Sequence, residues 1–179
     1  AEERGACPDA ADYGIKERFS NKTAIAPTAS ISIICGGTSP GVEPIAANSF
    51  THKTLSGSFN VRNRYLEKIL EKHNKNDDET WSGITTNQGS VSHLDFLTQQ
   101  EKDVFKTAFE LDQKWIVELG ADRTPHISQA QSINIFIPAD IHKKELHQIH
   151  FQAWKKGLKS LYYCRSKSIQ RAENVNDAK

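Results

Sequence analysis

Two short stretches of the sequence carry residues that could do chemistry. The first is TAIAPTASIS, residues 23–32, where an alternating, strand-like run ends in a proline and continues into small residues and hydroxyls. A loop that leads from a strand into a helix leaves backbone N–H groups unpaired, and the helix start carries partial positive charge. Small side chains at Ala29 and Ser30 would let these amides approach phosphate oxygens, and the Thr28 and Ser30 hydroxyls would add donors.

The same residues also have a plainer interpretation. Ser and Thr at a helix start commonly bond to the backbone of that helix, so the residue types alone favour a helix cap over an anion site. The stretch has no GxxxxGK[ST] pattern, which argues against an NTPase loop.

The second stretch contains Tyr162 and Tyr163, side by side in SLYYCR, a predicted strand. Neighbours in a regular strand point to opposite faces, and aromatic residues favour strands, so the residue types favour one core and one surface tyrosine. The alternative is redox chemistry, because a phenol can lose an electron and its proton together. Two rings could pass a radical if a local irregularity brought them together, given a radical source and an acceptor from a cofactor or partner.

The composition bounds the remaining possibilities. The chain has 179 residues, long enough for one domain with a sizeable core, and a formal net charge of +1. This balance argues against a nucleic-acid-binding arm and a polybasic membrane anchor, and no apolar run approaches the length of a membrane span. Three widely spaced cysteines fit a reducing, cytoplasmic compartment. The histidines of HKKELHQIH lack the HExxH pattern and suit a solvated helix flank, so no metal site is predicted.

Several elements must position the two stretches. A short strand is expected over 22–27, a hairpin around Ser56-Gly57, and a helix that includes Val61 and Leu70. The polar segment 72–97 is expected to be a surface excursion with a helical turn near Trp81. Thr98 to Glu101 forms a capping box, and the helix it opens should break near residue 110 and end at Gly120.

The C-terminal part of the sequence predicts a strand, a helix and a second strand over 131–165. Ile133, Ile135 and Ile137 alternate with polar or aromatic neighbours, and Asp140 is expected to cap the following helix. A βαβ unit implies parallel strands, whose ligands lie beyond their carboxyl ends. We therefore expect residues 27–32 and the tyrosine pair to share that end. The polar tail 166–179 is expected to be flexible.

Four segments together resemble a known family. AIAPTASIS, GGTSPGVEP, QAQSINIFIP and FQAWKKGLKSLYYCRS are similar to the C-terminal part of the large (α) subunit of class I ribonucleotide reductase. The resemblance covers essentially all of the chain, in the family's order. It implies an α/β fold in which residues 1–165 form the C-terminal part of a ten-stranded α/β barrel, incomplete on its own.

The resemblance also implies roles for particular residues, and it reverses both preferences above. Thr28, Ala29, Ser30 and Ile31 match the loop that holds the substrate's diphosphate, and Ser32 is a weaker addition. Tyr162 and Tyr163 match the stacked pair that relays a radical to the catalytic cysteine.

The family's radical cysteine, its reducing cysteine pair and its C-terminal redox tail have no match in this sequence, so Cys7, Cys35 and Cys164 receive no catalytic role. The expected partners are therefore an N-terminal portion of the large subunit, as in split phage-type subunits, and the small (β) subunit. The metallocofactor of the small subunit would supply the radical, and no cofactor is expected to bind this chain directly. The substrate would be a ribonucleoside diphosphate, reduced with a thioredoxin- or glutaredoxin-type reductant, in the host cytoplasm if the chain is phage-encoded.

A rival hypothesis keeps the same half-barrel but removes the chemistry. In it, the chain is a catalytically inert module that binds nucleotide phosphates or regulates another protein. Loss of turnover on replacing either tyrosine by phenylalanine would separate the two hypotheses, because phenylalanine lacks only the phenol O–H.

Overall fold

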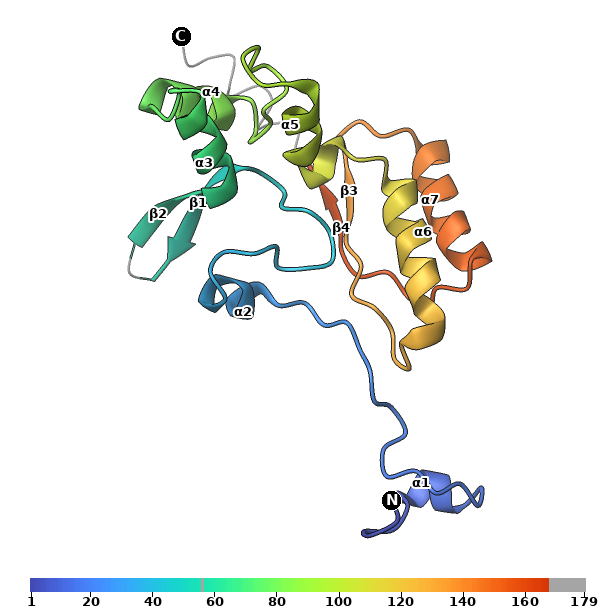
Figure 1. Ribbon diagram of the computed structural model, residues 1–179. Coiled ribbons are helices and arrows are strands. Elements are labelled where there is room, and N and C mark those ends of the chain that lie inside the picture. The colour runs from blue at the N-terminus through green and yellow to red at the C-terminus, as the bar shows by residue number, and fades with distance from the viewer. Residues whose placement is uncertain (56, 168–179) are drawn as a thin grey trace.

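The computed structural model describes residues 1–55 and 57–167 (Figure 1). Its first part holds two short helices, α1 (Pro8–Ala11) and α2 (Ala29–Ile34). The middle part holds, in order, β1 (Ser49–Thr54), β2 (Gly57–Arg62), α3 (Arg64–Lys72), α4 (Asp78–Thr86), α5 (Gln99–Val104) and the 3-10 helix η1 (Ala108–Glu110). The last part holds α6 (Gln113–Arg123), the 3-10 helix η2 (Thr124–His126), β3 (Ile135–Ile137), α7 (Lys143–Lys155) and β4 (Cys164–Ser166).

The hairpin is formed as the sequence predicts. β1 and β2 pair antiparallel from Ser49 opposite Arg62 to Thr54 opposite Gly57, and the predicted turn residue Ser56 lies outside the described residues. The expected helix begins later than its apolar pattern suggests, because Val61 still belongs to β2. Asn63 caps α3, and its side chain accepts a hydrogen bond from the Tyr65 amide.

The segment 72–97 is not the polar surface excursion that its composition indicates. It contains α4, and its apolar side chains are buried in a first core together with Leu66 and Leu70 of α3 and Phe105. The five contributors from the segment are Trp81, Ile84, Val91, Leu94 and Leu97. Polar residues between these positions hide the apolar pattern in the sequence. The buried Trp81 keeps its indole N–H paired, because this group donates to the Asn76 side-chain oxygen at 2.8 Å.

The capping box at Thr98 and Glu101 is present, and α5 ends before the break expected near residue 110. The expected helix end at Gly120 is wrong, because α6 continues to Arg123. Gly120 serves close packing instead. A Cβ atom at this position would lie 2.6 Å from Cδ1 of Ile133, so the glycine lets α6 approach the strand that follows it.

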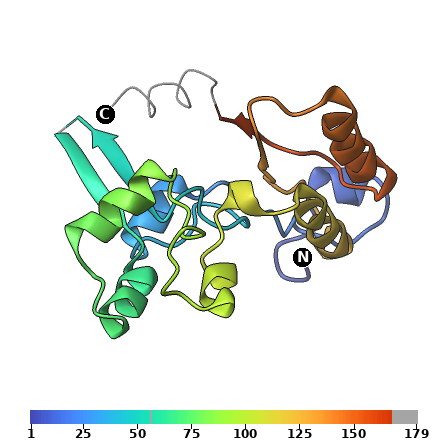
Figure 2. The ribbon, with the colours of Figure 1, turned by 90° about the horizontal axis from the view of Figure 1, so that it is seen from above.

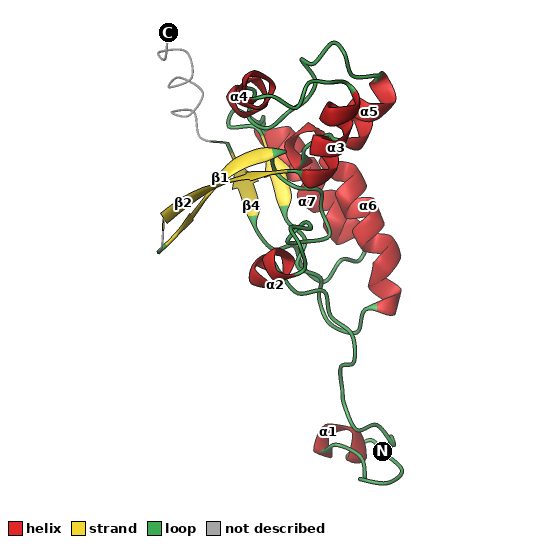
Figure 3. Ribbon diagram, turned by 60° about the vertical axis from the view of Figure 1, so that its left-hand side comes forward, coloured by secondary structure: helices red, strands yellow, loops and turns green. Residues whose placement is uncertain are grey.

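The last part of the chain has the strand–helix–strand arrangement. β3 and β4 pair in parallel, with Ile135 opposite Cys164 and Ile137 opposite Ser166. α6 and α7 lie side by side next to these strands (Figures 1 and 3). They enclose a second core with Ile116, Val117, Ile133, Ile135, Ile137, Ile149 and Ala153. Two end-point expectations are corrected: His142 rather than Asp140 caps α7, and Ser166 belongs to β4 rather than to a flexible tail, whose residues 168–179 lie outside the described part.

The two cores lie on either side of the molecule (Figure 2). The hairpin with α3 to α5, in cyan and green, is separate from α6, α7, β3 and β4, in olive to brown. Within the described residues the strands form two two-stranded sheets and no closed barrel, which fits an incomplete part of a larger barrel. The N-terminal segment with α1 extends away from both cores (Figure 1). No helix among the described residues has the length and apolarity needed to cross a membrane.

Candidate functional site

The backbone around β3 connects the two stretches singled out by the sequence. N–H and C=O groups of successive strand residues point to opposite edges. On one edge, the Ser132 N–H donates to the Ile25 carbonyl at 2.8 Å, and Ile25 forms a parallel bridge with Gln131. On the other edge, the Ile133 carbonyl accepts from the Tyr162 N–H at 2.8 Å. The segment that enters the 27–32 loop and the tyrosine pair therefore flank one strand.

The tyrosine pair interrupts the ladder with an extra residue. In a regular parallel ladder, one residue both donates to and accepts from its neighbouring strand. Here the Tyr162 N–H donates to the Ile133 carbonyl, whereas the Tyr163 carbonyl accepts from the Ile135 N–H at 2.9 Å. Two residues thus occupy the place of one, which is the hydrogen-bond pattern of a β-bulge.

This bulge explains why the two rings can be neighbours. The ring centroids of Tyr162 and Tyr163 lie 4.2 Å apart with an interplanar angle of 59°, although successive residues of a regular strand would point to opposite faces. Both rings are about half exposed, at 46% and 54%. The expected core-and-surface division of the pair is therefore not what the structure has, and the local irregularity required for a relay is present.

The charges around the rings affect the phenols. The pKa of Tyr162 lies above its ordinary value of 10, first because of a side-chain hydrogen bond with Tyr163 and then because a Tyr163 phenolate would repel a second negative charge. The Arg165 guanidinium, 5.2 Å from the Tyr163 ring centroid, opposes this rise. Tyr162 therefore keeps its proton at neutral pH.

Pro27 accounts for the end of the strand on the opposite edge. Alternate residues of a strand face the same neighbour, so Pro27 is the residue after Ile25 that would donate toward β3, and proline has no N–H. Pairing stops there, and the chain turns into α2. Only Ile25 of the strand predicted over 22–27 forms a β-bridge.

The helix-cap interpretation of the loop does not hold for Thr28. Its hydroxyl donates to the Pro40 carbonyl at 3.0 Å, its N–H donates to the same oxygen at 2.9 Å, and it makes no side-chain cap bond to α2. The N–H groups of Ala29, Ser30 and Ile31 have no acceptor among the described residues. These three residues are exposed, so the first turn of α2 presents free amides to its surroundings.

Ser32 differs from the rest of the loop. It is 4% exposed, and its hydroxyl donates to the Ala29 carbonyl at 2.7 Å within the same helix. Its side chain is committed to α2 and does not add to the exposed donors.

The two stretches do not share the carboxyl ends of the strands. The loop does follow the Ile25 segment, but Tyr162 and Tyr163 come before β4 and bond to residues 133 and 135. The expectation is therefore wrong for the tyrosines. The two tyrosines lie at the amino end of β4.

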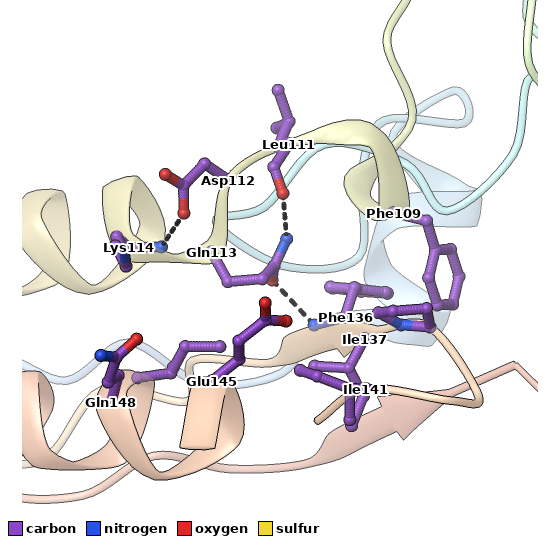
Figure 4. A pocket seen from close by; sticks show the side chains of 12 residues that line it. Phe109, Leu111, Asp112, Gln113, Lys114, Phe136, Ile137, Ile141, Glu145 and Gln148 are labelled. Carbon is purple, nitrogen blue, oxygen red and sulfur yellow. Dashed lines mark hydrogen bonds between the residues drawn. The ribbon is translucent and has the colours of Figure 1, made fainter. Parts of the chain in front are cut away.

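Two cavities in the described part of the chain lie elsewhere. One, of about 300 Å³, opens between β3 and the starts of α6 and α7, with apolar walls from Phe109, Phe136 and Ile137 and carboxylates from Asp112 and Glu145 (Figure 4). The other, of about 570 Å³, lies between the N-terminal segment and residues 125–128. Neither is lined by a predicted site residue.

The histidines on α7 have local partners. The His142 ring nitrogen accepts from the Lys144 amide, and His150 contacts the Leu146 carbonyl at 2.9 Å. Among the described residues, no three His, Cys, Asp or Glu side chains are grouped as a metal site would require.

Sequence patterns gave no indication of two polar side chains that close the loop-facing edge of β3. The Glu43 carboxylate accepts from the Asn134 N–H, and the side-chain amide oxygen of Gln113 accepts from the Phe136 N–H at 2.8 Å (Figure 4 shows the latter). The partners are 91 and 23 residues apart along the chain. No spacing rule links residues so distant. The family resemblance marks Glu43, in GGTSPGVEP, as a structural turn residue, whereas no sequence feature singles out Gln113.

Comparison with known proteins gives consistent matches. The family model of the ribonucleotide reductase barrel domain matches residues 8–164. The chain is 51% identical, over 97% of its length, to the ribonucleoside-diphosphate reductase large subunit of Invertebrate iridescent virus 6, and 46% identical, also over 97%, to that of Invertebrate iridescent virus 3. It covers 18% and 28% of those proteins.

A solved structure agrees in both fold and sequence. The class Id ribonucleotide reductase alpha subunit of Actinobacillus ureae superposes with a TM-score of 0.81 at 36% identity, over 100% of this chain and 31% of that one. The chain thus spans less than a third of the length of these relatives. It belongs to the ribonucleotide reductase barrel-domain family and corresponds to a portion of the large subunit, as the resemblance in its sequence predicts.

Proposed function

We propose that this chain supplies the substrate-diphosphate loop and the tyrosine radical relay of a class I ribonucleoside-diphosphate reductase. Thr28, Ala29, Ser30 and Ile31 form the loop, and Tyr162 and Tyr163 form the relay. The observation that carries the proposal is the bulge, because it brings two phenol rings to 4.2 Å at a place where a regular strand would separate them.

The relay follows from the chemistry of the phenol. A tyrosyl radical regains its O–H bond when the neighbouring phenol gives up one electron and one proton. The hole leaves the pair when a cysteine thiol, on a part of the large subunit outside this chain, supplies the last hydrogen atom. Because the pKa of Tyr162 lies above 10, its phenol is protonated at neutral pH, and the electron and the proton therefore leave together.

The loop supports the proposal through its unpaired donors. The three free amides at the start of α2 and the exposed Ser30 hydroxyl suit the oxygens of a diphosphate, and small side chains leave room for it. Thr28 contributes differently, since its donors hold the Pro40 carbonyl. The sugar and base would contact other parts of the large subunit.

The proposal requires partners that complete the enzyme. The remainder of the large subunit would supply the catalytic thiol, and the small subunit, with its metallocofactor, would supply the radical. Half-exposed rings at Tyr162 and Tyr163 fit a relay that must exchange a hole with groups outside this chain.

The decisive experiment replaces one oxygen atom at a time. In the complete large subunit with its small subunit, Tyr162→Phe and Tyr163→Phe should each abolish reduction of a ribonucleoside diphosphate while its dissociation constant stays unchanged. Tyr13→Phe is the matched control, since this ring is 81% exposed and lies in the N-terminal segment. Turnover in either relay variant would refute the relay and favour the inert module, which the reductase relatives otherwise do not support.

The loop is tested by binding. Ser30→Ala should weaken a ribonucleoside diphosphate about tenfold, the value of one hydrogen bond to a charged group, and leave the unphosphorylated ribonucleoside unaffected. Ser58→Ala, on the exposed hairpin strand β2, is the control. Equal affinities for the diphosphate in both variants would remove the loop from the proposal.

A further inference from the structure

A buried carboxylate lies beside the proposed loop and has no part in the mechanism above. Glu43 is 4% exposed, and no Lys or Arg of the described chain forms an ion pair with it. Its two oxygens accept from the Asn134 backbone N–H and from the Asn134 side-chain amide, the latter at 3.2 Å. A carboxylate buried without a cation is costly, so these two amide donors must carry most of the compensation.

The carboxylate occupies the place that the Ile25 strand leaves open. The Ser132 N–H bonds to the Ile25 carbonyl, and the next N–H on the same edge of the strand belongs to Asn134. The ladder does not continue beyond Ile25, and Glu43 supplies the acceptor for this N–H. The position of Glu43 is thereby fixed to the backbone of the strand with which the tyrosine bulge pairs.

A second set of bonds connects Glu43 to the loop. The Ser39 hydroxyl donates to the Glu43 carbonyl and closes the turn over residues 39–43. Pro40, inside this turn, offers its carbonyl oxygen to both donors of Thr28, the N–H at 2.9 Å and the hydroxyl at 3.0 Å. The bonds thus run from Asn134 through Glu43 and its turn to the first residue of the loop.

The turn lies directly against the carboxylate. A Cβ atom on Gly41 would come within 2.4 Å of a Glu43 carboxylate oxygen, so the backbone at this position tolerates no side chain without movement of Glu43. The Asn134 side chain depends on the same carboxylate, because its own oxygen is buried and has no hydrogen-bond partner among the described residues. Displacement of Glu43 would therefore shift the turn, and with it Thr28.

We propose that Glu43 is a positioning residue for substrate: through Asn134, Pro40 and Thr28 it holds the free amides of α2 at a fixed place relative to β3. This inference rests on the proposed function of the loop. A displacement of about an ångström is enough to weaken a positioned contact tenfold or more. The loss of affinity should therefore be seen with a ligand that carries the phosphate groups and not with the unphosphorylated nucleoside.

The test compares two ligands on the complete large subunit. Glu43→Gln replaces one acceptor oxygen by a donor that faces the Asn134 amides, and should raise the dissociation constant of a ribonucleoside diphosphate by about tenfold or more. The affinity for the unphosphorylated ribonucleoside should be unchanged, and KM should rise more than kcat falls. Glu79→Gln, at an exposed position of α4, is the control for the same chemical change.

A milder variant covers the case in which Glu43→Gln fails to fold. Ser39→Ala removes the hydroxyl that closes the turn and should shift the same ratio of affinities in the same direction by a smaller factor. An equal loss of affinity for both ligands, or no change in either variant, would overturn the inference. If Ser30→Ala also has no effect on diphosphate binding, the proposed function of the loop fails; if Ser30→Ala does have its effect, only the role of Glu43 is refuted.

Discussion

The two edges of β3 are closed by different kinds of group. Toward β4 the partners are backbone atoms, including those of Tyr162 and Tyr163, so the ladder there does not depend on which side chains are present. Toward the loop, two of the successive N–H groups are bonded by the side chains of Glu43 and Gln113. Backbone pairing leaves side chains free for chemistry, whereas side-chain closure makes single residues indispensable for structure. Substitutions on the edge toward β4 should therefore leave the stability nearly unchanged, whereas substitutions on the edge toward the loop should lower it.

The largest effect on stability is expected at Gln113. Gln113→Leu would leave the Phe136 N–H and the carbonyls of Ala108 and Leu111 without their partner, all in a mostly buried region. We expect a loss of about 3 kcal/mol in unfolding free energy, as several buried polar groups lose their hydrogen bonds. Urea unfolding of the complete large subunit measures it, with hydrogen exchange at the Phe136 amide as the local readout. Gln99→Leu on exposed α5 should change neither quantity, and an unchanged exchange rate at Phe136 in Gln113→Leu would contradict the side-chain closure.

A second substitution tests the packing of α6 against Ile133, on the face of the strand between these two edges. Gly120→Ala would overpack α6 against Ile133 and should cost about 1–3 kcal/mol. Adding Ile133→Val removes the methyl group that the new Cβ atom would meet, so the double variant should be more stable than the sum of the two single losses predicts. Strict additivity in urea unfolding would show that the contact is not the cause.

The backbone-paired edge should tolerate changes of side chain. Arg165→Gln removes the cation beside the Tyr163 ring and should alter unfolding free energy by less than about 1 kcal/mol. It should also raise the pKa of Tyr162 further, because the guanidinium is the charge that lowers it. Ultraviolet titration of the phenols checks the direction. A lowered tyrosine pKa in this variant would be inconsistent with the charge arrangement described.

The smallest effect on stability is expected away from β3, at the capping box of α5. Bonds from the Thr98 backbone and then from His73 lower the pKa of Glu101 from 4.5 to about 2. A depressed folded-state pKa contributes stability above pH 4.5, and this contribution is lost as the pH falls toward 2. The protection of the α5 amides from hydrogen exchange, taken relative to the intrinsic exchange rate at each pH, should therefore fall over this window in the native protein. In Glu101→Gln this fall in protection should disappear, and its persistence would assign the acid response to another group.

The sequence predicts those features that local spacing controls. The capping box, the hairpin, the βαβ order and the alternation of Ile133, Ile135 and Ile137 all depend on residues a few positions apart. The same local view fails for the buried residues of 72–97, because their burial is supplied by α3 and Phe105. It fails again at Gly120, where a helix-ending residue is retained inside α6 by contact with Ile133.

The candidate site divides in the same way. The exposed hydroxyl loop and the tyrosine pair are visible as unusual residue types, and the roles proposed for them rest on the resemblance to a family. The bulge, the Thr28 bonds to Pro40 and the buried Glu43 are set by hydrogen bonds across distant parts of the chain. Composition and periodicity carry no information on such pairings.

The extra residue at the tyrosine pair makes chain length part of the proposed relay. Removing either Tyr162 or Tyr163 would restore an ordinary ladder beside β3, and the strand that follows could still form. Such a deletion would preserve the architecture and leave a single phenol with no neighbour to exchange with. Under the proposed relay, the number of residues between α7 and β4 is thus constrained by radical transfer more tightly than by folding.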